Sequence, residues 1–509
     1  MILMNDYSQD LKANLLPVCT GKFVCVLNEI DAKEFGIFAG DRIELKNSRT
    51  EKSCVAIIDV TKDFIKEDSV GLFCEVKDLL GAKANNKINV KPTGRLNSVD
   101  LIKKKLNGGK LNSEELKQIV KDIADSRLSD IEASAFMAAV YMKGFDLEET
   151  VSMTKALIGN GKKINFTVEP IVDKHSIGGV NGRATMIIVP IVASMGLYIP
   201  KTSSRSITSC AGTADAMEIL APVDLSFEKI KSITKKHGGV ITWGGAVDLA
   251  PADDKIIRIR HPLALDPEGM LIASVLAKKA SVGSKYVVID IPVGENVKIK
   301  DTKQALAMAK KFVAVGKEVG MEVEAVITDG NEPSGLAFGP TIETKYALEI
   351  LEGKRFDNLA QKSCELAGAL FELTGRSRRG QGYHKAVEIL ESGQALKKMI
   401  DIIKAQGGTI TSSNQLILSS MNAEIKSTEE GIISKANVMT LTTIARTAGA
   451  PANKLAGLML NKTQGGKVKK GEVLFTIYAE NELKLKGAVD YAKKNNPFTF
   501  KKIIISTVR

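Results

Sequence analysis

The sequence predicts an α/β protein with a small helical lobe, a large α/β lobe, a barrel-like N-terminal domain and an α+β cap at the C-terminus. A chain of 509 residues is too long for one hydrophobic core. Through the middle of the chain, short β-branched runs alternate with helical patterns, as in a mostly parallel sheet covered by helices. The ends differ from this middle, because residues 1–93 look all-β with short helices and the tail from residue 426 is richer in lysine and glycine.

The first 93 residues predict a small barrel with an internal repeat. At an offset of about 45 residues, Leu27, Phe35–Gly36, Ile43 and Leu45 align with Leu72, Leu80–Gly81, Ile88 and Val90. Each half has the pattern strand, short helix, glycine and strand, which favours a pseudo-twofold barrel. No cluster of polar side chains in this domain suggests chemistry, so its expected role is in assembly.

Residues 94–160 predict a small helical lobe. Asn112 with Glu115 and Ser129 with Glu132 have the spacing of capping boxes, which mark two helix starts. Glycines end the next two helices, at Gly144 and Gly159.

Residues 161–249 and 284–425 predict the large α/β lobe. Buried strands are expected at 171–173, 239–243, 286–291 and 323–327, and a helix at 302–319 follows the cap Asp301. In the tail, residues 465–477 predict a hairpin of the β-hammerhead kind. Carrier domains of that shape place a lysine in a tight turn, and because no such turn is present, 426–509 is expected to be a structural cap.

Two loops in the α/β lobe have the composition of anion-binding sites. The first, from Lys174, follows a buried strand with a cation, an imidazole, a hydroxyl and two glycines, and precedes an apolar helix at 185–195. It lacks the ending of a nucleotide triphosphate loop and the spacing of a dinucleotide fingerprint. The second, Lys201–Thr213, is dense in serine and threonine. A surface linker would explain that composition too, but the apolar helix before it must be buried.

The second loop carries a resemblance to a known family. The run SSRSITSCAGTADAME, residues 203–218, resembles the signature of the thymidine and pyrimidine-nucleoside phosphorylases. KHSIGG and PKTSSR are closer still to the AMP phosphorylases, and the resemblance extends over nearly the whole chain, including the N-terminal segment. Ser206 and Cys210 stand where the signature usually has other small residues. The resemblance implies a nucleoside phosphorylase type II-like fold, in which 250–283 returns to the helical lobe and the active site lies between the lobes.

The implied reaction is phosphorolysis of nucleoside 5′-monophosphates: AMP and phosphate give adenine and ribose 1,5-bisphosphate, and CMP and UMP are further candidate substrates. The alternatives are a thymidine phosphorylase and, from another class, a nucleotide-binding or RNA-binding protein without turnover. The residues that match the family's phosphate contacts are Lys174, Ser176, Thr185, Ser203 and Thr213. The residues that match its substrate contacts are Gly178, Ser204, Arg205, Ser206, Ile207, Thr208, Ser209, Thr213, Ser274 and Lys298.

The resemblance also implies the residues at the leaving base. Asp266 matches a proton donor to the purine, although its place before Pro267 would also suit a helix cap. Ser274 follows two helical turns later, and His175 matches a residue at the base or sugar. Arg260 and Lys278 resemble the base-contacting cations of the pyrimidine enzymes.

Lys298 matches a lysine of the AMP phosphorylases where the thymidine enzymes are apolar, which suits a 5′-phosphate. A solvated surface lysine is the alternative.

The composition of the chain limits which partners and which cellular compartment are expected. The net charge of +12 is spread along helices and mixed with acids, and no basic stripe interleaves with aromatic residues, so neither nucleic acid nor a membrane is an expected partner. The N-terminus has no signal peptide pattern. The six cysteines have no metal-type spacing and are expected to be reduced thiols in the cytoplasm. The four histidines are far apart, so no metal and no cofactor is expected besides the co-substrate phosphate. The family resemblance implies a homodimer that assembles further through the N-terminal domain.

Overall fold

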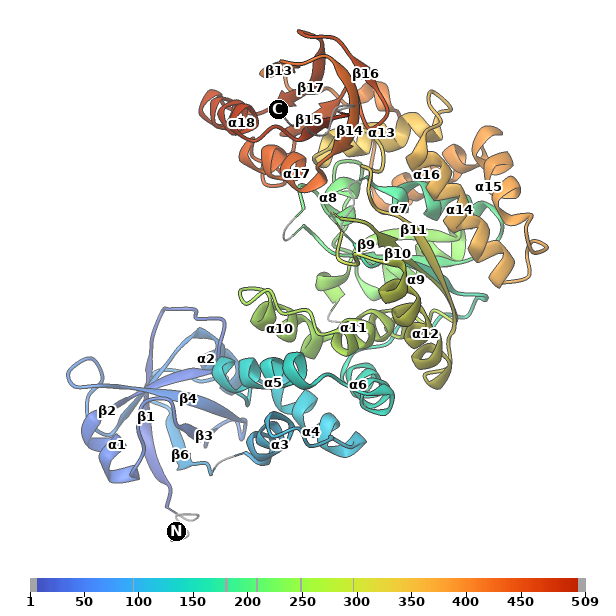
Figure 1. Ribbon diagram of the computed structural model, residues 1–509. Helices are drawn as coiled ribbons and strands as arrows, with labels where there is room; N and C mark the ends of the chain where they lie inside the picture. Colours follow the sequence, from blue (N-terminus) through green and yellow to red (C-terminus); the bar gives the residue numbers. More distant parts are fainter. Residues whose placement is uncertain are drawn as a thin grey trace, which may run out of the picture. The chain divides into compact units, whose positions relative to one another are not determined.

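The computed structural model describes residues 7–94, 96–178, 182–206, 209–247, 250–295 and 297–501 (Figure 1). The chain forms two compact units. One holds Met1–Asn160 and Pro251–Leu271, and the other holds Gly161–Ala250 and Ile272–Arg509.

The first unit begins with the predicted barrel, which is a closed sheet in the order β1-β5-β2-β4-β3-β6. Its elements are β1 (Gln9–Leu15), β2 (Val24–Asn28), α1 (Glu29–Phe35), β3 (Arg42–Asn47), β4 (Ser53–Thr61), β5 (Ser69–Leu72), α2 (Cys74–Leu80) and β6 (Lys87–Pro92). The repeat is confirmed, because β2, α1 and β3 recur as β5, α2 and β6. Gly36 and Gly81 end the two helices at φ 65° and 58°, a left-handed conformation that glycine adopts without strain.

The expectation that all cysteines are reduced is wrong for one pair. Cys19 and Cys74 form a disulfide, with their Cα atoms 5.0 Å apart. The parallel pairing of β1 with β5 places Leu15 beside Leu72, and this brings the loop after β1 to the start of α2. A separation of 55 residues conceals this proximity from the sequence. The other four cysteines, Cys25, Cys54, Cys210 and Cys364, are free.

The rest of the first unit is helical. Its helices are α3 (Asn97–Leu106), α4 (Ser113–Ala124), α5 (Asp130–Lys143), α6 (Leu147–Asn160) and α10 (Pro251–Arg260). Both predicted capping boxes form, at the starts of α4 and α5. Lys105 and Glu149 make an ion pair of 2.6 Å in which both residues are 3% exposed, so this lobe contains a buried charge pair.

The second unit is built on parallel strands. β7 (Val172–Ser176), β10 (Tyr286–Val293) and β11 (Glu322–Asp329) form one sheet in the order β11-β10-β7, and β8 (Ile199–Ser203) pairs with β9 (Gly239–Trp243). Within the described residues, one isolated parallel bridge, between Ile171 and Tyr198, joins the two sheets. The sequence therefore predicted a mostly parallel sheet correctly, but not the gap between β7 and β8.

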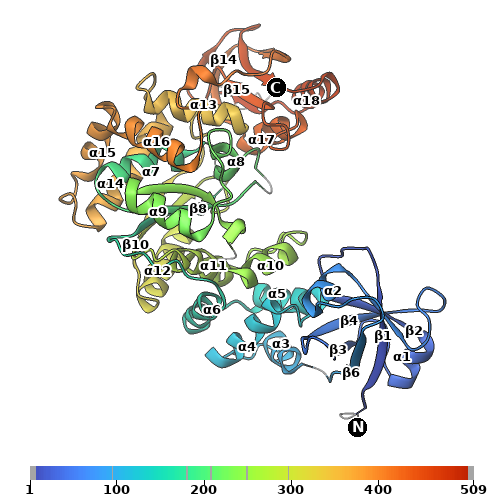
Figure 2. The same ribbon diagram turned by 180° about the vertical axis from the view of Figure 1, so that it is seen from behind.

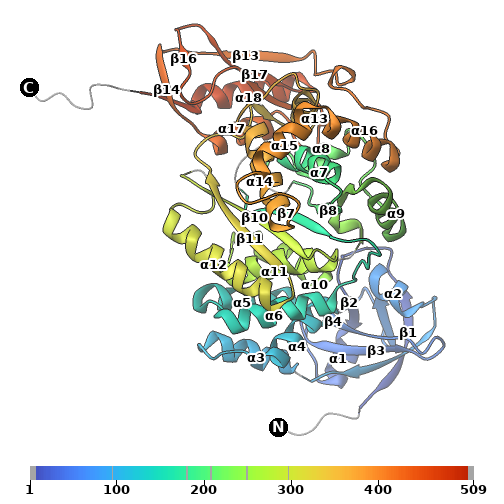
Figure 3. The same ribbon diagram turned by 90° about the vertical axis from the view of Figure 1, so that its right-hand side faces the viewer.

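Helices cover both faces of these strands. They are α7 (Ala184–Ser194), α8 (Thr213–Met217), α9 (Phe227–His237), α11 (Glu268–Ser281), α12 (Thr302–Glu318), α13 (Pro340–Leu351), α14 (Asn358–Leu373), α15 (Gly382–Glu391) and α16 (Gln394–Gln406), with short 3₁₀ turns at Gly244–Val247 and Ser413–Gln415. α7 is apolar on all sides because it is enclosed by α14, α16 and β9. α12 lies on the opposite side of β10 and β11 from α14 (Figures 1 and 3).

The C-terminal part of the second unit is an α+β domain (Figure 2). Its elements are β13 (Asn422–Lys426), β14 (Gly431–Ala436), α17 (Val438–Thr447), β15 (Gly457–Leu460), β16 (Lys467–Val468), β17 (Val473–Tyr478), α18 (Glu482–Lys494) and β18 (Phe498–Phe500), joined by β12 (Ala337–Phe338). The predicted hairpin at 465–477 is wrong. β16 does not pair with β17. It pairs with β14 in a three-stranded sheet, whereas β17 pairs with β13 and β15 in a separate four-stranded sheet. Among the described residues, no helix is both long and apolar enough to cross a membrane.

Candidate functional site

A pocket of about 400 Å³ lies within the second unit, where β7 and β8 end. It is lined by the two predicted loops and by four residues from elsewhere in the unit. The lining residues are Lys174–Gly178, Gly182–Thr185, Lys201, Ser203–Ser206, Ser209, Ala211–Thr213, Asp290, Lys298, Ser334 and Lys362. Six of these described side chains are lysine or arginine and one is acidic, so the pocket is suited to an anion.

Most of the predicted site residues meet in this pocket. All five residues predicted to hold phosphate line it, namely Lys174, Ser176, Thr185, Ser203 and Thr213. So do seven of the residues predicted to contact the rest of the substrate, namely His175, Gly178, Ser204, Arg205, Ser206, Ser209 and Lys298. Ile207 and Thr208 lie outside the described residues. The pocket therefore joins two loops that the sequence separates by an entire helix.

The first loop presents a buried cation and the start of a helix. Arg183, Ala184 and Thr185 at the start of α7 line the pocket, and the N-cap residue makes no side-chain cap bond. The first amide groups of a helix favour an anion. Lys174 is 5% exposed, and burial lowers its pKa to about 8 in spite of the attraction of Asp290. An anion bound beside it would favour the charged ammonium.

His175 follows Lys174 and is neutral in this environment. Burial, together with the ammonium groups of Lys279 and Lys201, holds the pKa of His175 well below its ordinary value of 6.5. At neutral pH the imidazole can therefore donate or accept a hydrogen bond, but it does not supply a positive charge.

A buried carboxylate organises the wall below Lys174. Asp173 is 0% exposed, and its Oδ1 accepts hydrogen bonds from the Lys201 ammonium at 3.0 Å and from the Lys174 amide at 2.7 Å. Its Oδ2 accepts from the Lys279 ammonium at 2.7 Å. Burial raises the pKa of Asp173, but the two lysines outweigh burial and hold it below its ordinary value.

A second cluster reaches the pocket from the other side of β7. The Lys362 ammonium on α14 lies 3.2 Å from Asp290 Oδ2 and donates to Thr328 Oγ1 at 3.1 Å. The Thr328 hydroxyl in turn donates to Asp290 Oδ1 at 2.5 Å. Burial raises the pKa of Asp290, but Lys174 and Lys362 outweigh it, so the carboxylate stays ionised between two cations.

The second loop is closed by one carboxylate. Asp215 Oδ2 accepts from the Ser206 amide at 2.7 Å and from the Gly212 amide at 2.8 Å, so it joins the two ends of the segment between them. Gly212 leaves no room for a side chain, since a Cβ atom there would lie 2.5 Å from the Ser204 carbonyl oxygen. Ser209 Oγ donates to the Ala211 carbonyl at 2.8 Å. This arrangement explains why a glycine is needed near the end of the loop.

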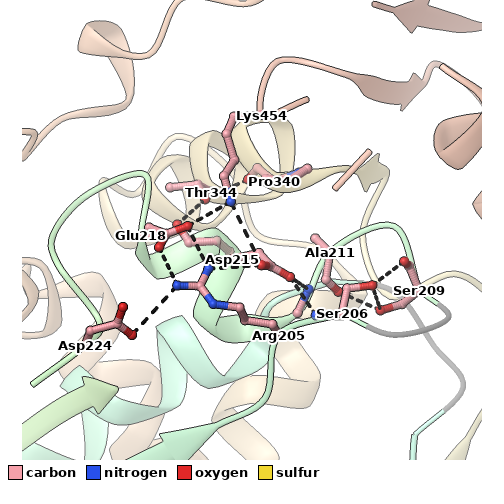
Figure 4. A network of polar contacts seen from close by, with 12 residues as sticks. Arg205, Ser206, Ser209, Ala211, Asp215, Glu218, Asp224, Pro340, Thr344 and Lys454 are labelled. Carbon is pink, nitrogen blue, oxygen red and sulfur yellow. Dashed lines mark hydrogen bonds and ion pairs between the residues drawn. The ribbon is translucent and has the colours of Figure 1, made fainter. Parts of the chain in front are cut away.

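Arg205 is held on the side of the loop by acidic residues, as Figure 4 shows. Its guanidinium donates to Glu218 at 2.8 and 2.6 Å, and Asp215 and Asp224 lie 3.5 and 3.8 Å away. It also lies over the Trp243 ring, 5.0 Å from the centroid. Lys454, from the C-terminal domain, donates to the same Glu218 at 2.8 Å. Hydrogen bonds from Arg205 lower the pKa of Glu218 to about 2, against partial burial.

Four predicted residues do not line this pocket. Arg260 and Asp266 belong to the first unit, where they form an ion pair. Ser274 and Lys278 lie on α11 in the second unit, and the charge of Lys278 contributes to the lowered pKa of His175. Over the described residues, no group of three His, Cys, Asp or Glu side chains is arranged to hold a metal ion.

The chain is closely similar to curated proteins of known name. It is 43% identical over 497 residues to AMP phosphorylase 1 of Archaeoglobus fulgidus, covering 97% of this chain and 98% of that protein. It is 41% identical over 502 residues to the AMP phosphorylase of Methanococcoides burtonii, covering 98% and 99% of the two chains. The chain belongs to the AMP phosphorylase family.

Three family models match successive segments of this AMP phosphorylase family member. They are the glycosyl transferase family helical bundle domain at residues 99–161, the glycosyl transferase family a/b domain at 168–396, and the pyrimidine nucleoside phosphorylase C-terminal domain at 432–499. An anthranilate phosphoribosyltransferase from Saccharomyces cerevisiae, solved in complex with PRPP and Mg, has the same fold. Its TM-score is 0.51 at 18% identity, covering 62% of this chain and 98% of that one.

Several residues that line the pocket of this family member were not predicted from the sequence. Lys362, Asp290 and Ser334 come from segments with no motif, so no sequence signal connected them to the loops. Lys201 stood inside the predicted second loop but was assigned no role. Arg183 Nε donates to the buried Glu343 at 2.5 Å, and this partner lies 160 residues away. Asp290 stands near the end of the predicted strand 286–291, so a search for charged residues at strand ends would have found it, whereas the strand β8 that carries Lys201 was not predicted.

Proposed function

We propose that this protein catalyses phosphorolysis of AMP, converting AMP and inorganic phosphate to adenine and ribose 1,5-bisphosphate. The observation that carries the proposal is the pocket, in which six basic side chains and two hydroxyl-rich loops face one space beside β7 and β8. Two anionic groups, the inorganic phosphate and the 5′-phosphate of the substrate, suit such a charge. The relatives named AMP phosphorylase support the same reaction.

The proposed chemistry divides the pocket into two ends. Lys174, with the hydroxyls of Ser203 and Thr213, holds inorganic phosphate so that one oxygen attacks C1′ of the ribose. The bond between C1′ and N9 of the base breaks, and its electron pair leaves with the base. Asp266 does not line the pocket and is ion-paired with Arg260, so its proposed role as the acid that protonates N7 of the purine requires it to leave that ion pair and take up a proton. Lys298 contacts the 5′-phosphate.

Neutral His175 suits the sugar or base end of this pocket. An imidazolium beside the developing oxocarbenium ion would oppose the positive charge at C1′, whereas a neutral ring can hydrogen-bond without that penalty. No metal and no cofactor take part in the proposed steps.

The direct test is phosphate-dependent release of free base. The purified chain is incubated with AMP, CMP, UMP, adenosine and thymidine in parallel, with and without phosphate, and the released base is quantified. The proposal expects phosphate-dependent release from AMP at a kcat/KM at least about a hundredfold above that for adenosine. A preference for thymidine would replace the proposal with a thymidine phosphorylase, and no base release from any substrate would favour a binding protein.

We further propose a cytoplasmic homodimer that assembles into larger particles through the barrel at its N-terminus and takes no nucleic acid partner. The barrel is closed and has its own hydrophobic core, so it can act as a separate module. Light scattering of the full chain and of a chain lacking residues 1–93 tests this. A particle with fewer chains that still binds phosphate is expected, and an unchanged number of chains per particle would refute the role in assembly.

A further inference from the structure

The strands β7 and β8 separate at the point where they reach the pocket. The Val172 amide donates to the Tyr198 carbonyl at 2.8 Å, and the bridge between Ile171 and Tyr198 is the last β pairing between these segments in the described chain. On its other edge β7 stays paired with β10 as far as Ser176. Continued pairing of β7 with β8 would bring the two loops together and leave no space for a ligand.

Side chains replace the missing strand pairing. The Lys201 ammonium, from β8, donates to the Lys174 carbonyl oxygen at 2.8 Å and to Asp173 Oδ1 at 3.0 Å. The Lys174 amide donates to the same Oδ1 at 2.7 Å. Both peptide groups of Lys174 on this edge are therefore satisfied by side chains, and a long lysine keeps the two strands apart.

The same carboxylate reaches a third segment. Asp173 Oδ2 accepts from the Lys279 ammonium of α11 at 2.7 Å, and the three residues Asp173, Lys201 and Lys279 are 0%, 5% and 2% exposed. Each belongs to a segment that carries predicted ligands. Lys174 and His175 follow Asp173, Ser203 lies two residues after Lys201, and Lys278 precedes Lys279.

We propose that Asp173, Lys201 and Lys279, which we name the strut, are positioning residues for the reaction: they set the separation of the two anion-binding loops and their place relative to α11. Asp173 and Lys279 do not line the pocket, so they act through the residues that do. The inference rests on the proposed function in one respect, namely that the pocket binds inorganic phosphate.

Stability alone does not account for the strut. Burying two ammonium groups and one carboxylate costs solvation that the ion pairs only partly recover, and apolar residues of the same volume are often as stable. Burial lowers the pKa of Lys279 to about 7 in spite of the attraction of Asp173, so the strut carries a net positive charge only while Lys279 is protonated. A role in setting the separation of the two loops explains why the chain keeps these buried charges despite their solvation cost, and why they lie between β7, β8 and α11.

The first experiment removes one arm of the strut. Lys201→Met keeps the length of the side chain but removes both of its hydrogen bonds. We expect the Kd for inorganic phosphate, measured by calorimetry without nucleotide, to rise at least about tenfold, and kcat with AMP to fall as well. A Kd within about twofold of the parent would overturn the proposal.

Two matched controls separate positioning from loss of stability. Lys105→Met breaks a buried ion pair with Glu149 in the first unit, and neither residue lines the pocket. Lys345→Met removes an ammonium of the second unit that donates to the carbonyl oxygens of Ser413 at 2.8 Å and Leu416 at 3.0 Å. Both controls are expected to lower Tm and to leave the phosphate Kd unchanged. If they raise that Kd as much as Lys201→Met does, the strut has no special role.

The second experiment distinguishes positioning from direct contact, since Lys201 itself lines the pocket. Asp173→Asn keeps the volume and the Oδ1 acceptor but removes the charge that holds both lysines. The double variant Asp173→Asn with Lys201→Met should bind phosphate about as weakly as Lys201→Met alone, because both changes break one device. If instead the increases in phosphate Kd caused by the two single substitutions multiply in the double variant, Lys201 acts as a direct ligand and the positioning role is overturned.

The outcomes also distinguish this inference from the proposed function. If Lys201→Met does not fold, Asp173→Asn alone carries the test through the same phosphate titration. If the parent chain binds no phosphate, the proposed function fails. If the parent binds phosphate and releases adenine while the strut variants match it, only the strut fails.

Discussion

Phosphate binding should weaken as the pH rises through the pKa of Lys174. Burial lowers the pKa of this ammonium to about 8 in the free pocket, so the charged form predominates below that pH and the neutral amine above it. A phosphate dianion beside Lys174 binds the charged form and raises its pKa again. The affinity for phosphate is therefore highest well below pH 8 and falls as the pH rises above 8.

The size of the effect follows from the same pKa. If only the protonated lysine binds phosphate, the apparent Kd rises about twofold at pH 8 and about elevenfold at pH 9, relative to its value at low pH. An exposed lysine, with an ordinary pKa of about 10.4, would give almost no change over this range.

The assay is the KM for phosphate between about pH 7 and about pH 9.5, with AMP held saturating and the Kd of sulfate measured alongside. Sulfate does not change its charge in this range, so it removes the ionisation of phosphate from the comparison. Lys174→Arg is the matched control, because an arginine stays charged throughout. The variant should bind less well but show a flat profile. A parent enzyme whose KM and sulfate Kd stay constant to pH 9.5 would refute the reasoning.

Four further predictions concern other parts of the site. Asp266→Asn should lower kcat with AMP at least about a hundredfold while the Kd for AMP stays within about twofold, and equal loss of binding would remove Asp266 as proton donor. Lys298→Ala should weaken the binding of AMP by about 1.5–3 kcal/mol but leave the binding of adenosine unchanged. An equal loss of affinity for both ligands would contradict a contact between Lys298 and the 5′-phosphate. Gly212→Ala should raise the KM for AMP at least about tenfold and lower Tm, since its Cβ would lie 2.5 Å from the Ser204 carbonyl oxygen; parent-like kinetics would show that the loop can move aside. Turnover should survive a chelator, and activity restored only by added metal would show that the proposed steps omit a necessary ion.

Local patterns in the sequence were sufficient for much of the fold. The repeat of the barrel, the two capping boxes and the parallel strands follow from apolar spacing and from short-range hydrogen bonds, and these depend on residues only a few positions apart. The same holds for the two loops, in which glycine and hydroxyl residues are adjacent in the chain. The family resemblance added the site residues that the loops contain.

Contacts between distant segments could not be obtained in this way. The disulfide of Cys19 with Cys74 follows from the pairing of β1 with β5, and the hairpin expected at 465–477 divides because β16 and β17 join different sheets. Neither periodicity nor spacing encodes which strand lies beside which.

The strut shows the same limit at the site itself. From the sequence, Lys174 was expected directly after a buried strand and Lys201 at the start of a loop rich in hydroxyls, whereas the structure has Lys174 within β7 and Lys201 within β8. Only the tertiary structure decided that Lys201 and Lys279 share one carboxylate, because Lys279 lies 106 residues from Asp173. A buried charge is stable only where its partners lie within hydrogen-bond reach, and for these residues the packing of β7, β8 and α11 determines that distance.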